Sequence, residues 1–543
     1  MFNFEKFEKS FEVTSDKKFS ESSRGMVSSA FPEASKAGAE MLKKGGNAVD
    51  AACAAAMALG VCEPQASGLG GQSMGIIHIK GTTLCIDGST RAPSLATPKQ
   101  YKNKLERTLG YKATTVPSTV AVLGFLNEKY GNLEWAQILK PSIKIAKRGY
   151  RITKLQQDLQ LRELENFKKI DSLSGAKYFL KDGNAPYDQN DRFVQDELSE
   201  LLSYLSENGY RSFYHGKIPK IIDADMRKNK GLLREDDLVM IPKIIEREPI
   251  VGKYRTVTLK TFPPPAVGRI LLLMLLLLNQ ISQKTIKNKK QEFYHYLVET
   301  FRRSLAFRTQ RPYDALTYKQ LDDKILFDKK FLKHLSESII DGIQINSKQN
   351  MKFYDEDTTH LSVMDDEGNA VGITQSIELV YGSKTVTEGL GFLYNSYMGS
   401  FEYDNINYPH YLRPNTNPWT SVAPTILFYK NKPWISLGTP GSDRIPTVLA
   451  QFISSILDSG LSANQAMDRP RIHCSVDGLV SIERDRFDNI LIPYLAELGY
   501  KIDQKESYSY FHGAIHAVIK KQTSKGFQGM AEIRRDGIAE GVD

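Results

Sequence analysis

An alanine-rich stretch near the start of the chain constrains the fold more than any other feature. Residues 48–61, AVDAACAAAMALGV, carry small or apolar side chains at almost every position, so a helix formed here has no polar face. Small side chains on all sides let neighbouring backbones approach closely, which predicts a helix buried against a sheet. Pro32 suits the first turn of a preceding helix, and Gly45 suits the end of that helix. Asn47 suits the N-cap of the buried helix.

Period-two patterns predict the strands of that sheet. After a glycine-rich turn, strands are expected near residues 74–79 and 83–87. From Asp357 onward, THLSVMD and AVGITQSIEL alternate on either side of the turn at residues 366–369, which predicts a hairpin. APTILFYK and KPWISLG predict two more strands, and the glycine loop after them leads into a helix. Strands with helices before and after them predict a layered α+β architecture.

Composition and apolar runs exclude several classes of protein. At roughly 150 residues per domain the length predicts about three or four domains, or fewer large ones. A net charge of +9 on a chain of 543 residues is a weak field, so no nucleic-acid partner is expected. The longest apolar run, residues 270–278, is far shorter than the ~20 residues of a membrane span. We expect it to form a buried helix, and we expect no membrane partner.

Other features of the sequence predict a cytoplasmic location and argue against disulfide, metal and nucleotide-binding sites. The amino terminus alternates charged and aromatic residues without the apolar core of a signal peptide, which predicts a cytoplasmic protein. The four cysteines show no CxxC pairing, so neither a metal nor a disulfide scaffold is expected, and no cofactor is predicted. The glycines at 68–71 follow a helix and precede a strand, the wrong order for a nucleotide-binding loop. The lysine-rich segment 282–350 is interpreted as a solvated connector with no chemistry.

A threonine pair that opens the predicted hairpin is the candidate nucleophile. HExxH, P-loop and nucleophile-elbow motifs are absent, which leaves Thr358 and Thr359 directly after an acidic run. The surrounding DTTHLSVMDDEGNAVGITQSIE closely resembles the centre of the γ-glutamyltransferase (γ-glutamyltranspeptidase) family. The block GMVSSAFPEASKAGAEMLKKGGNAVDAACAAAMALGVCEPQASGLGGQSMG resembles the same family, and TVPSTVAVLGFLNEKYG, PPPAVGRI, PTILFYKNKPWISLGTPGSDRIPT and RPRIH follow in the family's order.

The resemblance implies an N-terminal-nucleophile hydrolase with a four-layer αββα sandwich. It implies a chain that cuts itself between Asp357 and Thr358, giving a large region 1–357 and a small region 358–543 that form one intertwined domain. A threonine hydroxyl needs a base, and the α-amine that cleavage exposes on Thr358 can serve. Its reference pKa of about 7.7–8.0 lies near working pH. No metal or cofactor is implied.

The resemblance also implies the supporting residues of the acyl-transfer site. The family's oxyanion hole uses two backbone amides, which correspond here to Gly441 and Ser442. Ser376 stands where the family has a threonine that supports the nucleophile. Thr420 and Ser421 match a serine pair that binds the substrate carboxylate.

Three departures from the family alter the pocket for the head of a γ-glutamyl group. Ser89 occupies the position of the arginine that binds the α-carboxylate, and Arg91, two residues on, is the candidate to replace it. Glu378 replaces an asparagine that touches the head group, and Ser400 replaces the aspartate that pairs with the α-ammonium. Losing such a contact typically costs about 2–5 kcal/mol, so these changes can remove glutamyl selectivity while acyl transfer survives.

We therefore predict a self-processing enzyme that cleaves a small-molecule amide, with a γ-glutamyl compound such as glutathione as the substrate the family suggests. The altered head-group pocket leaves a non-glutamyl amidohydrolase open, of the oxamate or cephalosporin-acylase type. An uncleaved binding or scaffold protein is the alternative from another class. The two fragments are expected to stay associated, and a homo-oligomer is left open. His360 and the pair His473 and Cys474 are interpreted as structural residues.

Overall fold

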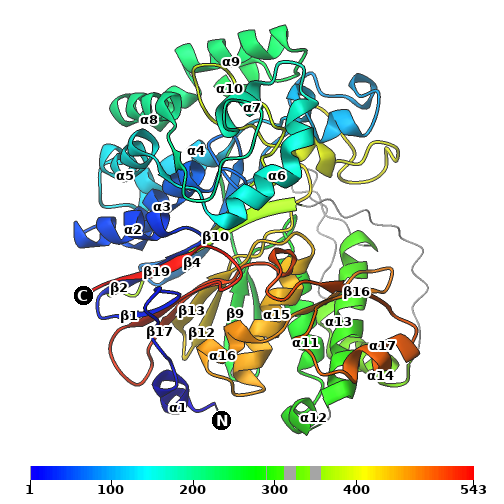
Figure 1. The fold of residues 1–543 in the computed structure, drawn as a ribbon. Helices are drawn as coiled ribbons and strands as arrows, with labels where there is room; N and C mark the ends of the chain where they lie inside the picture. The colour runs from blue at the N-terminus through cyan, green and yellow to red at the C-terminus, as the bar shows by residue number, and fades with distance from the viewer. Residues whose placement is uncertain (1, 289, 311–325, 343–355) are drawn as a thin grey trace.

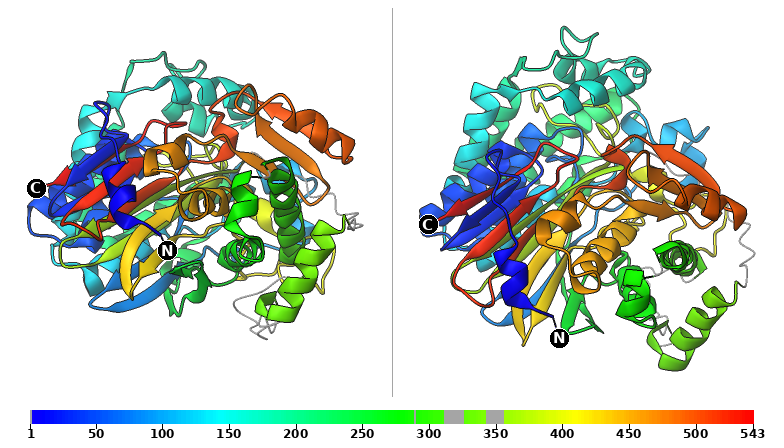
Figure 2. Two further views of the ribbon diagram at one scale, coloured as in Figure 1. Left: turned by 90° about the horizontal axis from the view of Figure 1, so that it is seen from below. Right: turned by 60° about the horizontal axis from the view of Figure 1, so that its bottom comes forward.

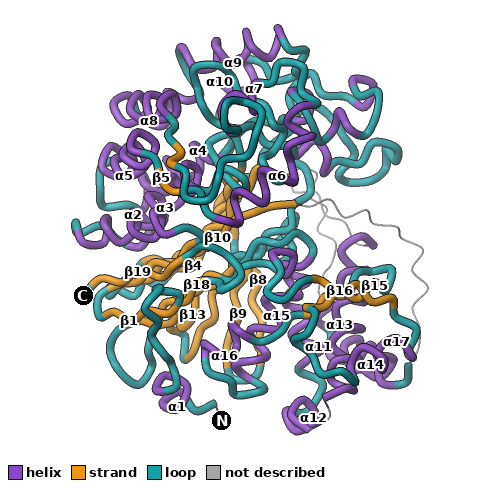
Figure 3. Tube along the Cα trace, viewed as in Figure 1, coloured by secondary structure: helices purple, strands orange, loops and turns teal. Residues whose placement is uncertain are grey.

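Two β-sheets stack face to face between two layers of helices, which confirms the predicted α+β sandwich. The computed structural model describes residues 2–288, 290–310, 326–342 and 356–543. Figure 1 shows the helices of residues 32–239 above the sheets and those of residues 268–340 and 444–497 below them. Coloured by secondary structure, the strands form the middle of the molecule and helices cover both outer faces (Figure 3).

The first sheet holds the predicted hairpin at its centre. Its strand order is β19 (Ile538–Val542), β2 (Gly25–Ser29), β10 (Glu356–Asp365), β11 (Ala370–Leu379), β3 (Gln72–Ile79), β4 (Thr82–Gly88) and β7 (Ile245–Arg247), and all neighbours are antiparallel. The turn between β10 and β11 is closed by Asn369, whose backbone N–H donates to Asp365 Oδ1 at 3.0 Å. The strands and the hairpin predicted from alternation are therefore confirmed.

The second sheet is also antiparallel throughout. Its order is β1 (Phe19–Ser22), β18 (Phe527–Ala531), β17 (His516–Lys520), β13 (Lys432–Gly438), β12 (Thr425–Tyr429), β9 (Val257–Thr261) and β8 (Ile250–Tyr254). The two sheets come into close contact at Gly438, where a Cβ atom would lie 2.3 Å from the His360 ring of β10. Glycine is therefore required at this point of contact between the layers.

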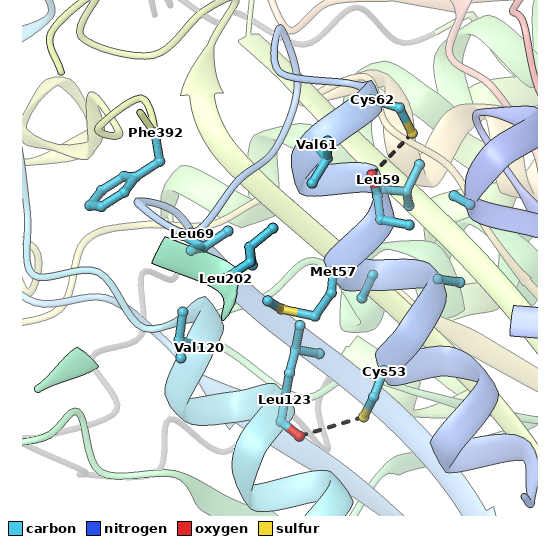
Figure 4. Close-up of a cluster of buried hydrophobic side chains, with 14 of the residues drawn as sticks. Cys53, Met57, Leu59, Val61, Cys62, Leu69, Val120, Leu123, Leu202 and Phe392 are labelled. Carbon is cyan, nitrogen blue, oxygen red and sulfur yellow. Dashed lines mark hydrogen bonds between the residues drawn. The ribbon is translucent and has the colours of Figure 1, made fainter. Parts of the chain in front are cut away.

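The helices over the first sheet begin with the pair predicted from the sequence. They are α2 (Pro32–Lys43), α3 (Ala48–Cys62), α4 (Thr119–Tyr130), α5 (Trp135–Arg148), α6 (Lys154–Lys168), α7 (Ser174–Phe179), α8 (Asp196–Asn208), α9 (Lys217–Lys228) and α10 (Glu235–Val239). Every residue of α3 is buried, and Asn47 caps it in a capping box with Asp50. Figure 4 shows Met57 and Leu59 of α3 among side chains from α4, α8 and the following loop. The alanine-rich helix is buried as predicted.

The other helical layer covers the second sheet. It contains α11 (Gly268–Leu278), α12 (Gln283–Asn288), α13 (Lys290–Gln310), α14 (Lys329–Ile340), α15 (Arg444–Leu457), α16 (Ala463–Asp468) and α17 (Leu491–Glu497), and α1 (Phe4–Lys9) packs on Trp434 of β13. A small sheet of β14 (Ile472–Cys474), β15 (Leu479–Glu483) and β16 (Lys501–Lys505) lies beside it, and β5 (Tyr150–Arg151) pairs with β6 (Arg192–Phe193) in the upper layer. In both views of Figure 2, α13 and α14 lie on the side opposite the C-terminus.

Two expectations about the segment that contains α11 to α14 have different outcomes. The apolar run forms α11, which is buried as predicted; in the described ranges no helix has the length and apolarity to span a bilayer. The interpretation of residues 282–350 as a solvated connector is wrong for α13. Phe293, Leu297 and Phe301 of this helix are buried in the core beneath the second sheet. They are four residues apart and share one helix face, a pattern that the interpretation missed because a lysine-rich run precedes the helix. Parts of that segment lie outside the described residues.

Candidate active site

Thr358 lies near the start of β10, in the buried middle of the sandwich. Its side chain is 6% exposed, and Asp357 before it is fully buried. The Thr358 N–H donates to Asp357 Oδ1 at 2.9 Å. The ladder with β11 changes register between Asp357 and Thr359. This irregularity gives the Asp357–Thr358 bond a geometry that differs from the regular strand after it.

Ser376 places a hydroxyl directly on the carbonyl of that bond. Ser376 Oγ donates to Asp357 O at 2.7 Å and accepts from Glu378 N–H at 2.8 Å. The second bond fixes the orientation of the hydroxyl, so its proton points at the carbonyl oxygen. A donor held against a carbonyl oxygen stabilises the negative charge that develops when a nucleophile adds to the carbon. The structure thus brings three residues predicted from the sequence, Asp357, Thr358 and Ser376, into one contact.

Arg535, which the sequence analysis missed, contacts the same bond from the loop between β18 and β19. Its Nη1 lies 3.2 Å from Asp357 Oδ1 and 3.5 Å from Thr358 O. The same nitrogen lies 3.8 Å from Glu63 Oε1, and the guanidinium stacks 3.9 Å from the centroid of the Tyr510 ring. One buried cation therefore lies beside two buried carboxyl groups next to the candidate nucleophile.

Glu63, also missed, is the residue that follows α3. Its burial raises its pKa to about 8; the charge of Arg535 opposes that shift, and the charge of Asp357 adds to it. Glu63 is the first charged residue after the apolar part of the alanine-rich helix. That position is a sequence signal for a buried charge, but nothing in the sequence indicates that its partner is Arg535.

Gly441 and Ser442 form a tight loop between β13 and α15. Gly441 has a φ of 128° and Ser442 a φ of 53°, so both adopt backbone conformations that favour glycine. The loop is closed by Arg444 N–H donating to Gly441 O at 2.9 Å and Ile445 N–H donating to Ser442 O at 3.0 Å. The left-handed backbone of Ser442 is strained, and strain of this kind is found at functional sites. Ser442 thus adopts a conformation that a second glycine would adopt without strain.

Arg308 of α13 joins this loop to the predicted carboxylate-binding pair. Arg308 forms a buried ion pair with Asp443, and its Nη2 donates to Ser421 Oγ at 2.9 Å. Its guanidinium lies 4.3 Å from the centroid of the Trp419 ring. Thr420 accepts a long contact of 3.4 Å from Gln72 Nε2. The segment expected to carry no chemistry therefore supplies a cation to Asp443, beside the Gly441 loop, and to Ser421.

The residues that stand in the family's head-group positions form hydrogen bonds with neighbouring side chains. Ser400 Oγ donates to Glu378 Oε1, and Glu378 adopts a left-handed φ of 79°. Ser89 donates from both its N–H and its Oγ to Asp87 Oδ1, at 3.0 and 2.6 Å. The structure brings Glu378 and Ser400 together, as two parts of one pocket should be.

Arg91 points to a different part of the molecule. Its Nη2 donates to the backbone carbonyls of Asp237 at 2.6 Å and Met240 at 2.8 Å, at the C-terminal end of α10. A cation at a helix C-terminus is favourable, so this position has a structural explanation. To replace the clamp arginine, Arg91 would first have to break both bonds.

The structure agrees with the interpretation of His360 and of the pair His473 and Cys474 as structural residues. Burial lowers the pKa of His360 to about 3, and its ring bonds to Thr374 Oγ1 at 2.9 Å and to Ser362 Oγ at 3.0 Å. Burial also lowers the pKa of His473 to about 3, and its Nδ1 lies 3.1 Å from Thr447 Oγ1. Cys474 belongs to the apolar core beneath the second sheet. Both rings are neutral and structural.

An αββα sandwich with a threonine near the start of a central strand defines the class of N-terminal-nucleophile hydrolases. Comparison with known proteins gives the family. The family model described as Gamma-glutamyltranspeptidase matches residues 34–542. The chain belongs to the γ-glutamyltranspeptidase family, and it is an enzyme of that family.

Three similar proteins show how far the sequence and the fold of this chain resemble those of known proteins. The chain is 31% identical to the glutathione hydrolase proenzyme of Escherichia coli (strain K12), over 83% of this chain and 81% of that one. It is 29% identical to the glutathione hydrolase proenzyme of Bacillus subtilis (strain 168), over 96% of this chain and 92% of that one. A crystal structure of cephalosporin acylase from Bacillus halodurans superposes with a TM-score of 0.87 at 24% identity, over 98% of this chain and 99% of that one. The last likeness shows the shared fold.

Proposed function

We propose that this chain is a proenzyme that cuts itself between Asp357 and Thr358 and then cleaves small-molecule amides with Thr358. The observation that carries the proposal is the hydrogen bond from Ser376 Oγ to Asp357 O at 2.7 Å. It polarises the one carbonyl that must react for Thr358 to become an amino terminus. The alternative of an uncleaved scaffold gives this contact no role.

In the maturation step, Thr358 Oγ adds to the carbonyl carbon of Asp357. The C–N bond breaks, the hydroxyl proton passes to the departing nitrogen, and an ester joins Asp357 to Thr358 Oγ. Water then hydrolyses the ester, which leaves a carboxylate on Asp357 and a free α-amine on Thr358. Ser376 supports the oxyanion in the addition step by the bond it already makes.

In the amide-cleaving step, the new amine acts as the base. It takes the proton from Thr358 Oγ as the oxygen adds to the substrate carbonyl carbon, and it gives that proton to the leaving amine. The acyl group remains as an ester on Oγ until water or an acceptor amine removes it. We assign the oxyanion hole of this step to the amides of Gly441 and Ser442, because their loop has the left-handed backbone that turns successive N–H groups toward one point.

Cleavage is tested by following the chain on a denaturing gel and by intact mass. We expect the wild type to separate into fragments of 357 and 186 residues, the smaller one beginning Thr-Thr-His. Thr358→Ala should remain one chain of 61.2 kDa without amidase activity, because it lacks the attacking oxygen. A Thr358→Ala chain that still breaks at this bond would show that another group is the nucleophile.

For the substrate, we propose a γ-glutamyl compound such as glutathione, which the names of the Escherichia coli and Bacillus subtilis relatives suggest. A non-glutamyl amide is the second candidate, because Ser89 is bonded to Asp87 and Glu378 to Ser400 where the family binds the glutamyl head. Release of aniline from a γ-glutamyl anilide, compared with a panel of other small amides, separates the two. Strong turnover of the γ-glutamyl anilide alone would exclude the second candidate.

A further inference from the structure

The two amides assigned to the oxyanion hole are unpaired in the part of the chain that the structure describes. Gly441 and Ser442 are buried, and neither N–H donates a hydrogen bond to another described residue. Buried backbone amides are almost always paired, so two adjacent unpaired N–H groups are available to an acceptor from outside the chain. Donors of an oxyanion hole are most effective when they already point at the position where charge develops. Whatever aims these N–H groups therefore affects the rate of amide cleavage.

The direction of each N–H is set by the carbonyl on the other side of its peptide bond. In a trans peptide the C=O of one residue and the N–H of the next point in opposite directions. The Ser442 N–H is therefore fixed by the Gly441 carbonyl, which accepts from Arg444 N–H at 2.9 Å. The Gly441 N–H depends in the same way on the carbonyl of Pro440, and the bond between these two residues is trans. The proline ring fixes the φ of Pro440, so the rotation about its ψ is what remains to be held.

The side chain of Thr439 holds that rotation. Thr439 Oγ1 donates to Pro440 O at 2.8 Å and accepts from Ala514 N–H at 2.8 Å. Because the second bond uses the oxygen as an acceptor, it directs the hydroxyl proton to the carbonyl. Thr439 is 1% exposed, so both bonds are shielded from water. A Cβ atom on Gly513 would lie 2.8 Å from Pro440 O, so glycine is required where this backbone closes over the carbonyl.

We propose that Thr439 is a positioning residue for amide cleavage, which acts through the Pro440 carbonyl to aim the Gly441 N–H at the oxyanion. The inference rests on the proposed function, in which that N–H stabilises the tetrahedral intermediate of the substrate. Self-cleavage uses a different donor, Ser376 Oγ on the carbonyl of Asp357, and does not depend on Thr439. Comparing the two reactions therefore separates a local effect on the loop from a general loss of stability.

The experiment compares Thr439→Val with wild type in both reactions. Valine keeps the shape of threonine and removes the hydroxyl. For the anilide that the wild type cleaves, we expect kcat to fall about 30-fold and KM to change less than about threefold, because the oxyanion forms only during the reaction. Self-cleavage, followed on a denaturing gel, should stay within about threefold of the wild-type rate because Ser376 is intact. An unchanged kcat, or an equal fall of both rates, would overturn the inference and leave the proposed function intact. A wild type that stays one chain and cleaves no amide would overturn both.

Two further variants test whether the hydroxyl itself is responsible. Thr439→Ser keeps the hydroxyl and should retain at least about a third of the wild-type kcat. Thr425→Val is the matched control, because Thr425 is also buried and its Oγ1 lies 2.9 Å from both Thr261 Oγ1 and Ala423 O, at the start of β12 and outside the loop. It should leave kcat and KM close to those of wild type. A failure of serine to restore kcat, or an equal fall in the control, would overturn the assignment to Thr439.

A second measurement uses the wild type, so it holds even where a variant does not fold. Crystals of the mature enzyme are soaked with the boronic acid in which B(OH)2 replaces the γ-carboxyl of glutamate. Thr358 Oγ adds to boron and its proton passes to the α-amine, which gives a tetrahedral anion that resembles the intermediate of amide cleavage. We expect one boronate oxygen within hydrogen-bond distance of Gly441 N while Thr439 Oγ1 stays bonded to Pro440 O. A boronate oxygen held by other donors, or a Thr439 hydroxyl turned away from Pro440 O, would overturn the inference.

Discussion

The Ser376 hydroxyl donates to the carbonyl of Asp357, which belongs to the bond proposed to break. We expect Ser376→Ala to slow cleavage about 100-fold, the order of effect that follows loss of one oxyanion donor. The time course of two-band formation on a denaturing gel measures it. Ser376→Thr keeps the hydroxyl and should cleave at a rate close to that of wild type. Equal rates for the alanine variant and wild type would contradict the role of this hydrogen bond.

The raised pKa of Glu63 predicts that the free energy of unfolding depends on pH. Burial raises its pKa from an ordinary value of 4.5 to about 8 in the folded chain, so between these values the folded state binds more protons than the unfolded state. Stability that depends on protonated Glu63 is therefore present at low pH and lost as pH rises toward 8. We expect Glu63→Gln to reduce this loss.

The measurement is urea unfolding at both ends of that pH range, in the uncut Thr358→Ala background so that one chain unfolds. The free energy of unfolding should fall with pH more steeply in the chain that keeps Glu63 than in the chain that also carries Glu63→Gln. Parallel pH profiles would show that Arg535 keeps Glu63 ionised throughout.

Some residues of the site can be predicted from local motifs, and others are found only in the folded structure. Thr358, Ser376, Gly441 and Ser442 lie in contiguous motifs, so a single stretch of sequence predicts each of them. Arg535, Glu63 and Arg308 reach the site from elements far apart in the chain, and their partners are set by packing. Arg91 was a candidate because of its spacing in sequence, but its side chain bonds to the end of α10.

At the scale of elements, the contact between α2 and α3 depends on Gly38. A Cβ atom there would lie 2.9 Å from Ala51 O and 3.0 Å from Val27 Cγ1. In an exposed helix, glycine to alanine stabilises by about 1 kcal/mol. Here the clash with a backbone carbonyl opposes that gain, and overpacking typically costs about 1–3 kcal/mol.

We therefore expect Gly38→Ala to destabilise the chain although it raises helix propensity. The measurement is the urea midpoint in the Thr358→Ala background, and Lys36→Ala on the exposed face of α2 is the matched control. A higher midpoint for Gly38→Ala than for the parent would mean that the helices separate at little cost.

The elements themselves were largely predictable because their signals are local. Asn47 and Pro32 marked helix starts, and alternation marked β10 to β13; each depends on residues a few positions apart. The order of strands within each sheet depends on pairings between distant segments, such as β2 with β10 and β19. The apolar face of α13 was missed because lysines dominate its surroundings in the sequence.

In the whole molecule, the proposed cut would divide both sheets between two fragments. In the first sheet β11 and most of β10 would belong to the small fragment and lie between β2 and β3 of the large one, and in the second β12 of the small fragment would pair with β9 of the large one. Separation would break ladders in both sheets and expose both cores. We expect the fragments of 357 and 186 residues to elute together in gel filtration and to separate only in denaturant. Fragments that separate in native buffer would contradict this strand arrangement.

The sequence alone determined the family and the α+β sandwich and predicted the threonine proposed as the nucleophile, because each depends on short motifs and local periodicity. Only the tertiary structure decided which charges surround that threonine. Arg535 meets Glu63 and Asp357 because the loop between β18 and β19 and the end of α3 reach the start of β10, and contacts made across such distances in the chain leave no local pattern. The physical reason is that burial and pairing of charge are properties of the packed interior.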